Sequence, residues 1–195
     1  MIIIGQNELS SIPLDLNIEA SPVSFSQDVL DVYKETHFLI YTPTKYKDGS
    51  PITLNSLRNF FGVNPSHDPC FYNQDWYLNE DFAKNTSLDG KWHLMAKNVR
   101  DDMRGRQPEN IEKTFSREQF PTAVTAAFSF FAYWFHTGGE KLWKNDFTWC
   151  RDLDHNGDRI YVGRYEDPDG VNKNGFNIHR HLSIRDIYSV ALEIK

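Results

Sequence analysis

The chain of 195 residues has little cysteine, and its two cysteines lie far apart. Cys70 and Cys150 show no Cys-x-x-Cys spacing, so the sequence contains neither a thiolate zinc motif nor the framework of a disulfide-rich fold. Two isolated cysteines are typical of a reducing compartment. We therefore expect two free thiols, with one Cys70–Cys150 disulfide as the alternative.

Positive charge is also scarce, because 21 Lys and Arg residues stand against 27 Asp and Glu residues, which gives a net charge of −6. Nucleic-acid binding needs a basic surface to neutralise phosphates, so this balance argues against a nucleic acid as partner. The first residues, MIIIGQNELSS, have no basic start and no long apolar run. They do not resemble a signal peptide, and we expect a cytoplasmic protein.

Motifs that name a reaction are missing. The sequence has no Gly-x-Ser-x-Gly elbow, no phosphate-binding glycine loop, no dinucleotide fingerprint and no His-Glu-x-x-His pair. The longest strongly apolar segment, Pro121–His136, is shorter than the ~20 residues that span a bilayer, so we expect no membrane association. Whether the protein is an enzyme stays open at this point.

Aromatic residues, in contrast, are abundant: 14 Phe, 9 Tyr and 5 Trp. Each ring buries a large apolar area, so most of them are expected in a core. Trp149, Tyr161 and Tyr165 are kept as candidates for a stacking or sugar-binding surface. The length is that of one domain, and we predict a single globular domain over residues 1–195.

The clearest helix is Pro121–His136, because Pro121 suits the first helical position and Gly138 suits the end. Apolar residues cover most of its circumference, which predicts a buried helix packed under a sheet. Strands are predicted at Thr36–Thr42 and Trp92–Val99, and a short helix is predicted between Thr53 and Gly62. The segment Ser183–Lys195 fits a helix, which we favour, or a strand.

Asn156-Gly157 lies between two β-rich runs and predicts a two-residue hairpin turn. This turn pairs His155 with Asp158 and places Trp149 opposite Arg164. A second turn at residues 167–170 leads to a third strand, Phe176–Leu182. The fold class predicted is therefore α+β, with an antiparallel sheet, clearest at residues 147–182, packed on the buried helix 121–136.

Side chains alternate along strands, so the predicted register defines a polar face of this sheet. That face gathers carboxylates, phenols and imidazoles as candidate ligand-binding residues: Asp152, Asp154, Tyr161, Tyr165, His179 and His181. The hypothesis that we prefer is a binding or assembly module that uses this face for a small polar ligand or a protein partner. The oligomeric state is left open.

The alternative hypothesis is a divalent-metal-dependent hydrolase. His179 and His181 lie two residues apart on one strand, so both imidazoles project the same way. With Asp152 they form a candidate ligand set for zinc, iron or manganese, and a second aspartate would act as general base. The run from Asp152 to Asp158 is also similar to the start of an EF-hand loop. It lacks the bidentate Glu and the exit helix, so a hairpin turn explains it better than calcium.

Overall fold

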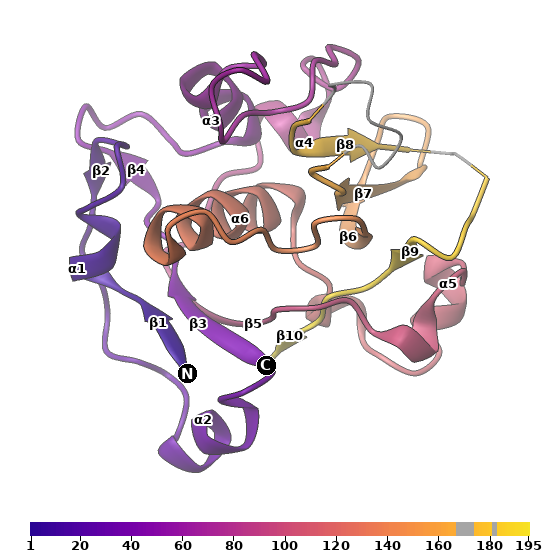
Figure 1. The fold of residues 1–195 in the computed structure, drawn as a ribbon, viewed down its shortest axis with the longest axis horizontal. Coiled ribbons are helices and arrows are strands. Elements are labelled where there is room, and N and C mark those ends of the chain that lie inside the picture. Colours follow the sequence, from indigo (N-terminus) through magenta and orange to yellow (C-terminus); the bar gives the residue numbers. More distant parts are fainter. Residues whose placement is uncertain (167–173, 181–182) are drawn as a thin grey trace.

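The computed structural model describes residues 1–166, 174–180 and 183–195, and it confirms the mixed α+β fold class. One long helix, α6 (Ala123–Thr137), lies in the middle of the molecule. A four-stranded sheet lies on either side of it, as Figure 1 shows. The predicted arrangement of a sheet packed on a buried helix is therefore confirmed, with a second sheet beyond the predicted one.

Helix α6 begins after its N-cap residue, Thr122, and ends at its C-cap residue, Gly138. The Thr122 hydroxyl accepts a hydrogen bond from the backbone N–H of Thr125 at 3.1 Å, and Gly138 ends the helix in the left-handed conformation. Pro121 thus precedes the cap instead of occupying the first helical position. Every residue from Ala123 to Tyr133 is buried. No helix among the described residues is long and apolar enough to cross a membrane.

The first sheet has the strand order β1-β3-β5-β10. Its inner strands match the strands predicted from β-branched content and alternation. Strand β1 pairs with β3 in parallel, and the other pairs are antiparallel. The strands are β1 (Ile2–Ile4), β3 (His37–Tyr41), β5 (Trp92–Ala96) and β10 (Glu193–Ile194).

The second sheet has the order β8-β7-β6-β9 and contains the three strands predicted around the hairpin. Strands β6, β7 and β8 are antiparallel neighbours, whereas β9 lies parallel to β6. The predicted turn at residues 167–170 and residues 181 and 182 lie outside the described residues. The strands are β6 (Phe147–Leu153), β7 (Arg159–Gly163), β8 (Asn177–His179) and β9 (Tyr188–Ser189).

The predicted register of the β6–β7 hairpin is wrong. Trp149 pairs with Tyr161 instead of Arg164, and the register shifts again before Leu153. The turn is also longer than two residues, because the Asp154 carboxylate accepts the backbone N–H groups of Asn156 and Asp158 at 2.9 and 2.8 Å. Side-chain hydrogen bonds of this kind favour an Asx-type turn, which the two-residue reading of Asn156-Gly157 does not consider.

The corrected register changes which side chains share a face, since an odd slip moves every side chain to the other side. Phe147, Trp149 and Tyr161 now lie together in one hydrophobic cluster with Tyr188. On the other face, Cys150, Ile160, Val162 and Ile178 join the main core that contains α6. The sheet is therefore covered on both faces, and the open polar face predicted from the sequence does not form.

The helix favoured for Ser183–Lys195 is wrong as well. The chain there forms the two short strands β9 and β10, which join the edges of different sheets. Tyr188, Val190 and Leu192 are buried in the cluster around Trp149. The alternation of these residues was the correct signal, because pairing with β6 and β5 satisfies the backbone that a helix would have satisfied internally.

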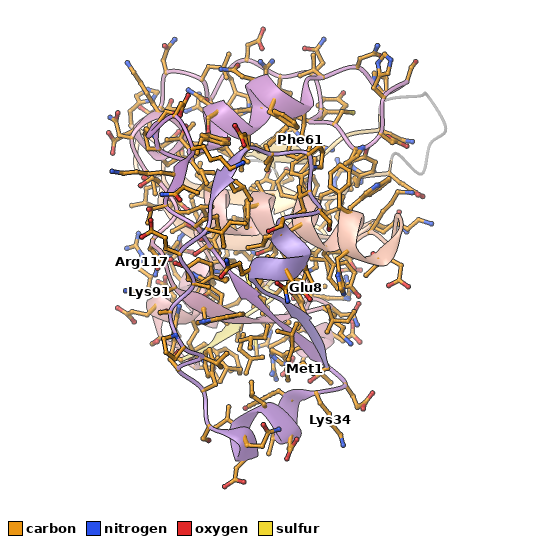
Figure 2. All side chains as sticks on the ribbon, turned by 90° about the vertical axis from the view of Figure 1, so that its left-hand side faces the viewer. Met1, Glu8, Lys34, Phe61, Lys91 and Arg117 are labelled. Carbon is orange, nitrogen blue, oxygen red and sulfur yellow. The ribbon has the colours of Figure 1, made fainter. Side chains whose placement is uncertain are left out.

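The remaining elements are short and cover the periphery. Helix α3 confirms the prediction after Thr53, whose side chain caps it, and Gly62 ends it. Figure 2 shows Met1 and Lys34 toward one end of the molecule, where α2 lies, and Phe61 toward the other end. These elements are α1 (Gln6–Leu9), β2 (Leu16–Asn17), α2 (Gln27–Tyr33), β4 (Lys45–Tyr46), α3 (Leu54–Phe61), α4 (Asp81–Lys84), η1 (Asp101–Met103), α5 (Pro108–Ile111) and η2 (Arg117–Gln119).

Candidate functional site

The two tyrosines predicted on one face lie on opposite sides of the second sheet. Tyr161 is buried in the cluster of Trp149, and its ring stacks against His179 with centroids 6.0 Å apart. Tyr165 stacks on Phe130 of α6 instead. The cause is a break in strand alternation, because Gly163 and Arg164 both have positive φ, 120° and 41°.

Tyr165 makes contacts of a structural kind. Its hydroxyl donates to the Asp68 carboxylate and accepts the backbone N–H of Cys70 at 3.1 Å. Burial and the bond to Asp68 raise the pKa of this phenol well above its ordinary value. Cys70 and Cys150 are both buried free thiols, as expected from their spacing. Burial raises the pKa of both thiols, so neither is a reactive thiolate at neutral pH.

Asp152 points toward the start of α6. Its Oδ2 atom accepts the backbone N–H of Ala123 at 2.7 Å, which satisfies one of the free donors at the helix terminus. Burial raises the pKa of this carboxyl, although the Ala123 bond opposes the shift. The structure does not place Asp152 beside His179, and His181 lies outside the described residues. The metal set proposed from the sequence is therefore not assembled by the described residues.

His179 borders a cavity of about 150 Å³ at the end of β8. Its Nε2 atom lies 3.0 Å from Gln74 Nε2, so the imidazole accepts there and carries its proton on Nδ1. Burial, followed by the nearby charge of Arg164, lowers the pKa of His179 to about 4. The ring is therefore neutral at pH 7. The other residues that line this cavity are Tyr72, Gln74, Phe147, Arg164, Glu166 and Asn177.

Arg164 supplies the positive charge of this cavity. Its guanidinium makes no hydrogen bond or ion pair with any other side chain of the described part of the chain, whereas Glu166 is paired with Lys141 and Lys144 at 2.8 and 3.1 Å. The backbone holds Arg164 in place, because its N–H lies 2.7 Å from the carbonyl of Asp146. Among the described residues that line the cavity next to His179, Arg164 is therefore a cation without an ion-pair partner.

Asp154 belongs to a second polar group, together with Glu80 and His155. Their ligand atoms lie within 4.8 Å of one another, so these three residues could hold a metal ion. His155 Nδ1 lies 2.7 Å from Glu80, and the Arg180 guanidinium contacts Asp154 and lies 3.5 Å from Glu80. Arg180 also packs over the ring of Trp76 at 4.5 Å. The hydrogen bonds to Asp158 and Arg180 outweigh burial and lower the pKa of Asp154.

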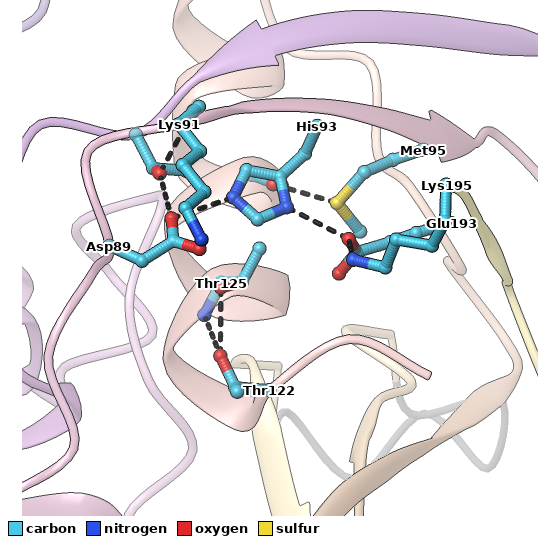
Figure 3. Close-up of polar contacts among 10 residues, drawn as sticks. Asp89, Lys91, His93, Met95, Thr122, Thr125, Glu193 and Lys195 are labelled. Atoms are coloured by element: carbon cyan, nitrogen blue, oxygen red, sulfur yellow. Dashed lines mark hydrogen bonds and ion pairs between the residues drawn. The ribbon is translucent and has the colours of Figure 1, made fainter. Parts of the chain in front are cut away.

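A third polar group, centred on His93, was not predicted from the sequence. Figure 3 shows the imidazole between two carboxylates, with Nδ1 2.8 Å from Glu193 and Nε2 2.9 Å from Asp89. Burial alone lowers the pKa of His93, but both carboxylates outweigh it and raise the pKa to about 9. Both ring nitrogens therefore donate at pH 7. Both ring nitrogens are therefore occupied, and the contact with Glu193 connects β5 to β10.

The sequence contains two features that indicate this group, but they lie in separate segments: the strand predicted at Trp92–Val99 and the segment Ser183–Lys195. His93 interrupts an apolar strand, and a polar residue at a buried position needs a partner. Glu193 lies in the segment for which a helix was favoured, so no partner was expected there. Lys195 adds a contact to the Glu193 carboxylate. The cavity beside this group has a volume of about 760 Å³ and an apolar wall that includes Phe25, Tyr33 and Trp92.

Comparison with known proteins identifies no relative: no family model, no curated protein and no solved structure matches this chain. Among the described residues, polar side chains border cavities at His179, Glu80 and His93. Of these, the cavity next to His179 combines a residue predicted from the sequence with Arg164, a cation that has no ion-pair partner in the described part of the chain.

Proposed function

We propose that the protein is a binding module for a small anionic ligand, such as a carboxylate, in the cavity next to His179. The observation that carries this proposal is the guanidinium of Arg164, which lines the cavity without a hydrogen-bonding partner in the described part of the chain. A partly buried charge without a partner is costly, and an anion is its natural complement. The guanidinium fork would bind both oxygens of a carboxylate.

The backbone of Arg164 supports the same conclusion. A φ of 41° costs an ordinary L-residue about 1 kcal/mol or more relative to glycine, and such strain concentrates at binding sites. Glycine at this position would relieve the strain, so the arginine side chain is retained at a cost in stability. Ligand binding is the function that this side chain could supply in return.

The neighbouring groups favour a ligand with further polar atoms. Gln74 Oε1 is buried and has no hydrogen-bond partner in the described structure. Neutral His179 adds no second charge, and Tyr72 offers a hydroxyl at the same cavity. A volume of about 150 Å³ limits the ligand to a few heavy atoms.

The test is calorimetric titration of the protein with acetate, lactate, succinate and inorganic phosphate. We expect at least one small carboxylate to bind, and Arg164→Gln to weaken binding by tenfold or more, since a charge-assisted bond contributes about 1.5–3 kcal/mol. Arg106→Gln is the matched control, because Arg106 is exposed and does not line the cavity. Equal affinities in both variants would refute the site.

The second candidate function is divalent-metal-dependent hydrolysis at Glu80, Asp154 and His155. The observation in its favour is their close spacing beside a cavity of about 600 Å³, which Asp81 also lines as a candidate general base. Arg180 opposes it, because its guanidinium already neutralises two of the three ligands. This function therefore ranks second.

Elemental analysis for zinc, iron and manganese, with the melting temperature before and after chelation, separates the two functions. Stoichiometric metal and a lower melting temperature on chelation would support the hydrolase. Arg180→Gln is a sharper probe, because removing the internal cation should raise the affinity of the three ligands for added zinc. If zinc binds neither protein, the metal function is wrong.

A further inference from the structure

The cavity of about 760 Å³ beside the His93 group is lined by residues of α2, η2, β5, β6 and β10. Figure 1 shows α2 below the first sheet, apart from the rest of the molecule. The size of this cavity is within the range of sites that bind whole small molecules. It shares no lining residue with the cavity next to His179, so a ligand here would be a second one.

The apolar side of α2 is incompletely covered. None of its seven residues is buried, although Val29 and Tyr33 both line the cavity. These two residues lie four positions apart and therefore on one side of the helix. A helix of this length is unstable in water by itself and depends on the packing of its apolar side. An apolar group in the cavity would complete that packing.

Aromatic rings line the same cavity. Phe25, Tyr33 and Trp92 all contribute to its wall, and each of them is half-buried. The indole of Trp92 is held in place, because its Nε1 atom donates to the carbonyl of Ser21 at 2.7 Å and its ring packs 5.5 Å from that of Tyr41. Aromatic rings contact other rings favourably in stacked and edge-to-face arrangements. This part of the wall therefore favours an aromatic group.

Two cationic side chains line the cavity without a hydrogen bond or an ion pair in the described part of the chain: Lys91 and Arg151. Lys91 is exposed, and Figure 3 shows its side chain extending toward Asp89. Arg151 is half-buried, so its guanidinium is partly removed from water but still accessible. Both cations can therefore attract a ligand that enters the cavity.

The charge balance of the cavity favours one negative charge on that ligand. His93 is charged and is paired with Asp89 and Glu193, and Lys195 also contacts Glu193. Among the described lining residues, the cationic groups are thus Lys91, Lys195, Arg151 and His93, and the carboxylates are Asp89, Glu118 and Glu193. The cations exceed the carboxylates by one. A single carboxylate on the ligand would neutralise this excess.

We propose that this cavity binds an aromatic carboxylate, with its ring among Phe25, Tyr33 and Trp92 and its carboxylate on Arg151. The planar guanidinium of arginine binds a carboxylate through two parallel hydrogen bonds. The ammonium group of Lys91 adds attraction at longer range. Such a ligand is larger than the small carboxylates proposed for the cavity next to His179, which holds about 150 Å³. This proposal therefore does not depend on the anion site.

The test uses three probes that separate the ring from the charge. Naphthalene-2-acetate carries both, 2-(2-naphthyl)ethanol carries the ring alone, and acetate carries the charge alone. Calorimetric titrations are made on the Arg164→Gln protein, so that the anion site does not contribute. We expect saturable binding of naphthalene-2-acetate, binding of naphthylethanol that is about tenfold weaker, and no binding of acetate.

Two further substitutions in this background test the cations. Arg151→Gln should weaken the binding of naphthalene-2-acetate about tenfold, because a charge-assisted hydrogen-bond pair is lost. Lys91→Gln should weaken it only about threefold, because water screens an exposed charge. Neither substitution should change the affinity for naphthylethanol. Lys45→Gln is the matched control, because Lys45 is exposed but does not line the cavity.

Methyl signals in NMR spectra give the location of the bound probe. Val29 and Ile194 line the cavity and should shift with naphthalene-2-acetate, whereas Val63 does not line it and should not shift. The proposal is wrong if naphthalene-2-acetate does not bind or if naphthylethanol binds equally well. It is also wrong if Lys45→Gln weakens binding as much as Arg151→Gln, or if Val29 and Ile194 do not shift.

Discussion

His93 Nδ1 on β5 lies 2.8 Å from Glu193 Oε2 on β10, although the two residues are 100 positions apart in the chain. The contact is buried, and Asp89 holds the other ring nitrogen. A charged imidazole between two carboxylates thus joins the last strand to the first sheet. Because β9 and β10 join different sheets, this contact also helps to fix the position of the chain between them.

The first prediction concerns the cost of breaking this group. His93→Phe preserves the ring volume but leaves two carboxylates without their shared cation. We expect a loss of about 3–5 kcal/mol in the free energy of unfolding, because removing one partner leaves a buried charge without its counter-charge. Urea denaturation measures it. His67→Phe is the control, because His67 is exposed and should change stability by less than about 0.5 kcal/mol.

The second prediction is the pH dependence of the same group. The pKa of His93 is raised from 6.5 to about 9 in the folded protein, so its stabilising contribution is complete below pH 6.5 and is lost as the pH rises through 9. Asp89 and Glu193 have lowered pKa values, so their contribution is lost in acid, below their ordinary values of 3.8 and 4.5. The difference in unfolding free energy between wild type and His93→Phe should therefore shrink at both ends. A difference that stays constant from pH 6 to 10 would contradict the charged imidazole.

The third prediction separates stability from binding at Arg164. Arg164→Gly relieves a positive φ but adds chain entropy to the unfolded state, so we expect the free energy of unfolding to stay equal or rise by up to about 1 kcal/mol. Small carboxylates should bind at least tenfold more weakly. Chemical denaturation and calorimetry measure the two effects. A variant that is clearly less stable would show that Arg164 has a structural role instead.

The fourth prediction compares two glycines next to the strands of the second sheet: Gly157 in the β6–β7 turn and Gly175 just before β8. A Cβ atom on Gly175 would lie 2.4 Å from the backbone nitrogen of Tyr72, whereas a Cβ on Gly157 would meet nothing within 4 Å. We expect Gly175→Ala to destabilise the protein by about 3 kcal/mol or more. Gly157→Ala should cost only about 1 kcal/mol, from its φ of 86°. Similar melting temperatures for the two variants would contradict the close approach at Tyr72.

The sequence located most of the regular elements because their signals are local. Helix α6 has its cap, its apolar surface and its terminal glycine within residues 122–138, and β3 and β5 show β-branched content and alternation. The α+β class follows from these elements. His179 and Tyr161 were predicted on the same face of the sheet, and they are paired across β7 and β8.

Tertiary structure alone decided the hairpin register, the secondary structure of residues 183–195 and the composition of the sites. The register depended on hydrogen bonds of the Asp154 carboxylate and on the positive φ of Gly163 and Arg164, none of which leaves a periodic pattern. An odd slip then exchanged the faces of the sheet, which separated Asp152 from His179. Asp154 is paired with Arg180 and lies close to Glu80. His93 is paired with Glu193 and also with the nearby Asp89. All of these residues except Asp89 are distant in the chain. Such contacts form when the whole core packs, and short-range patterns carry no record of them.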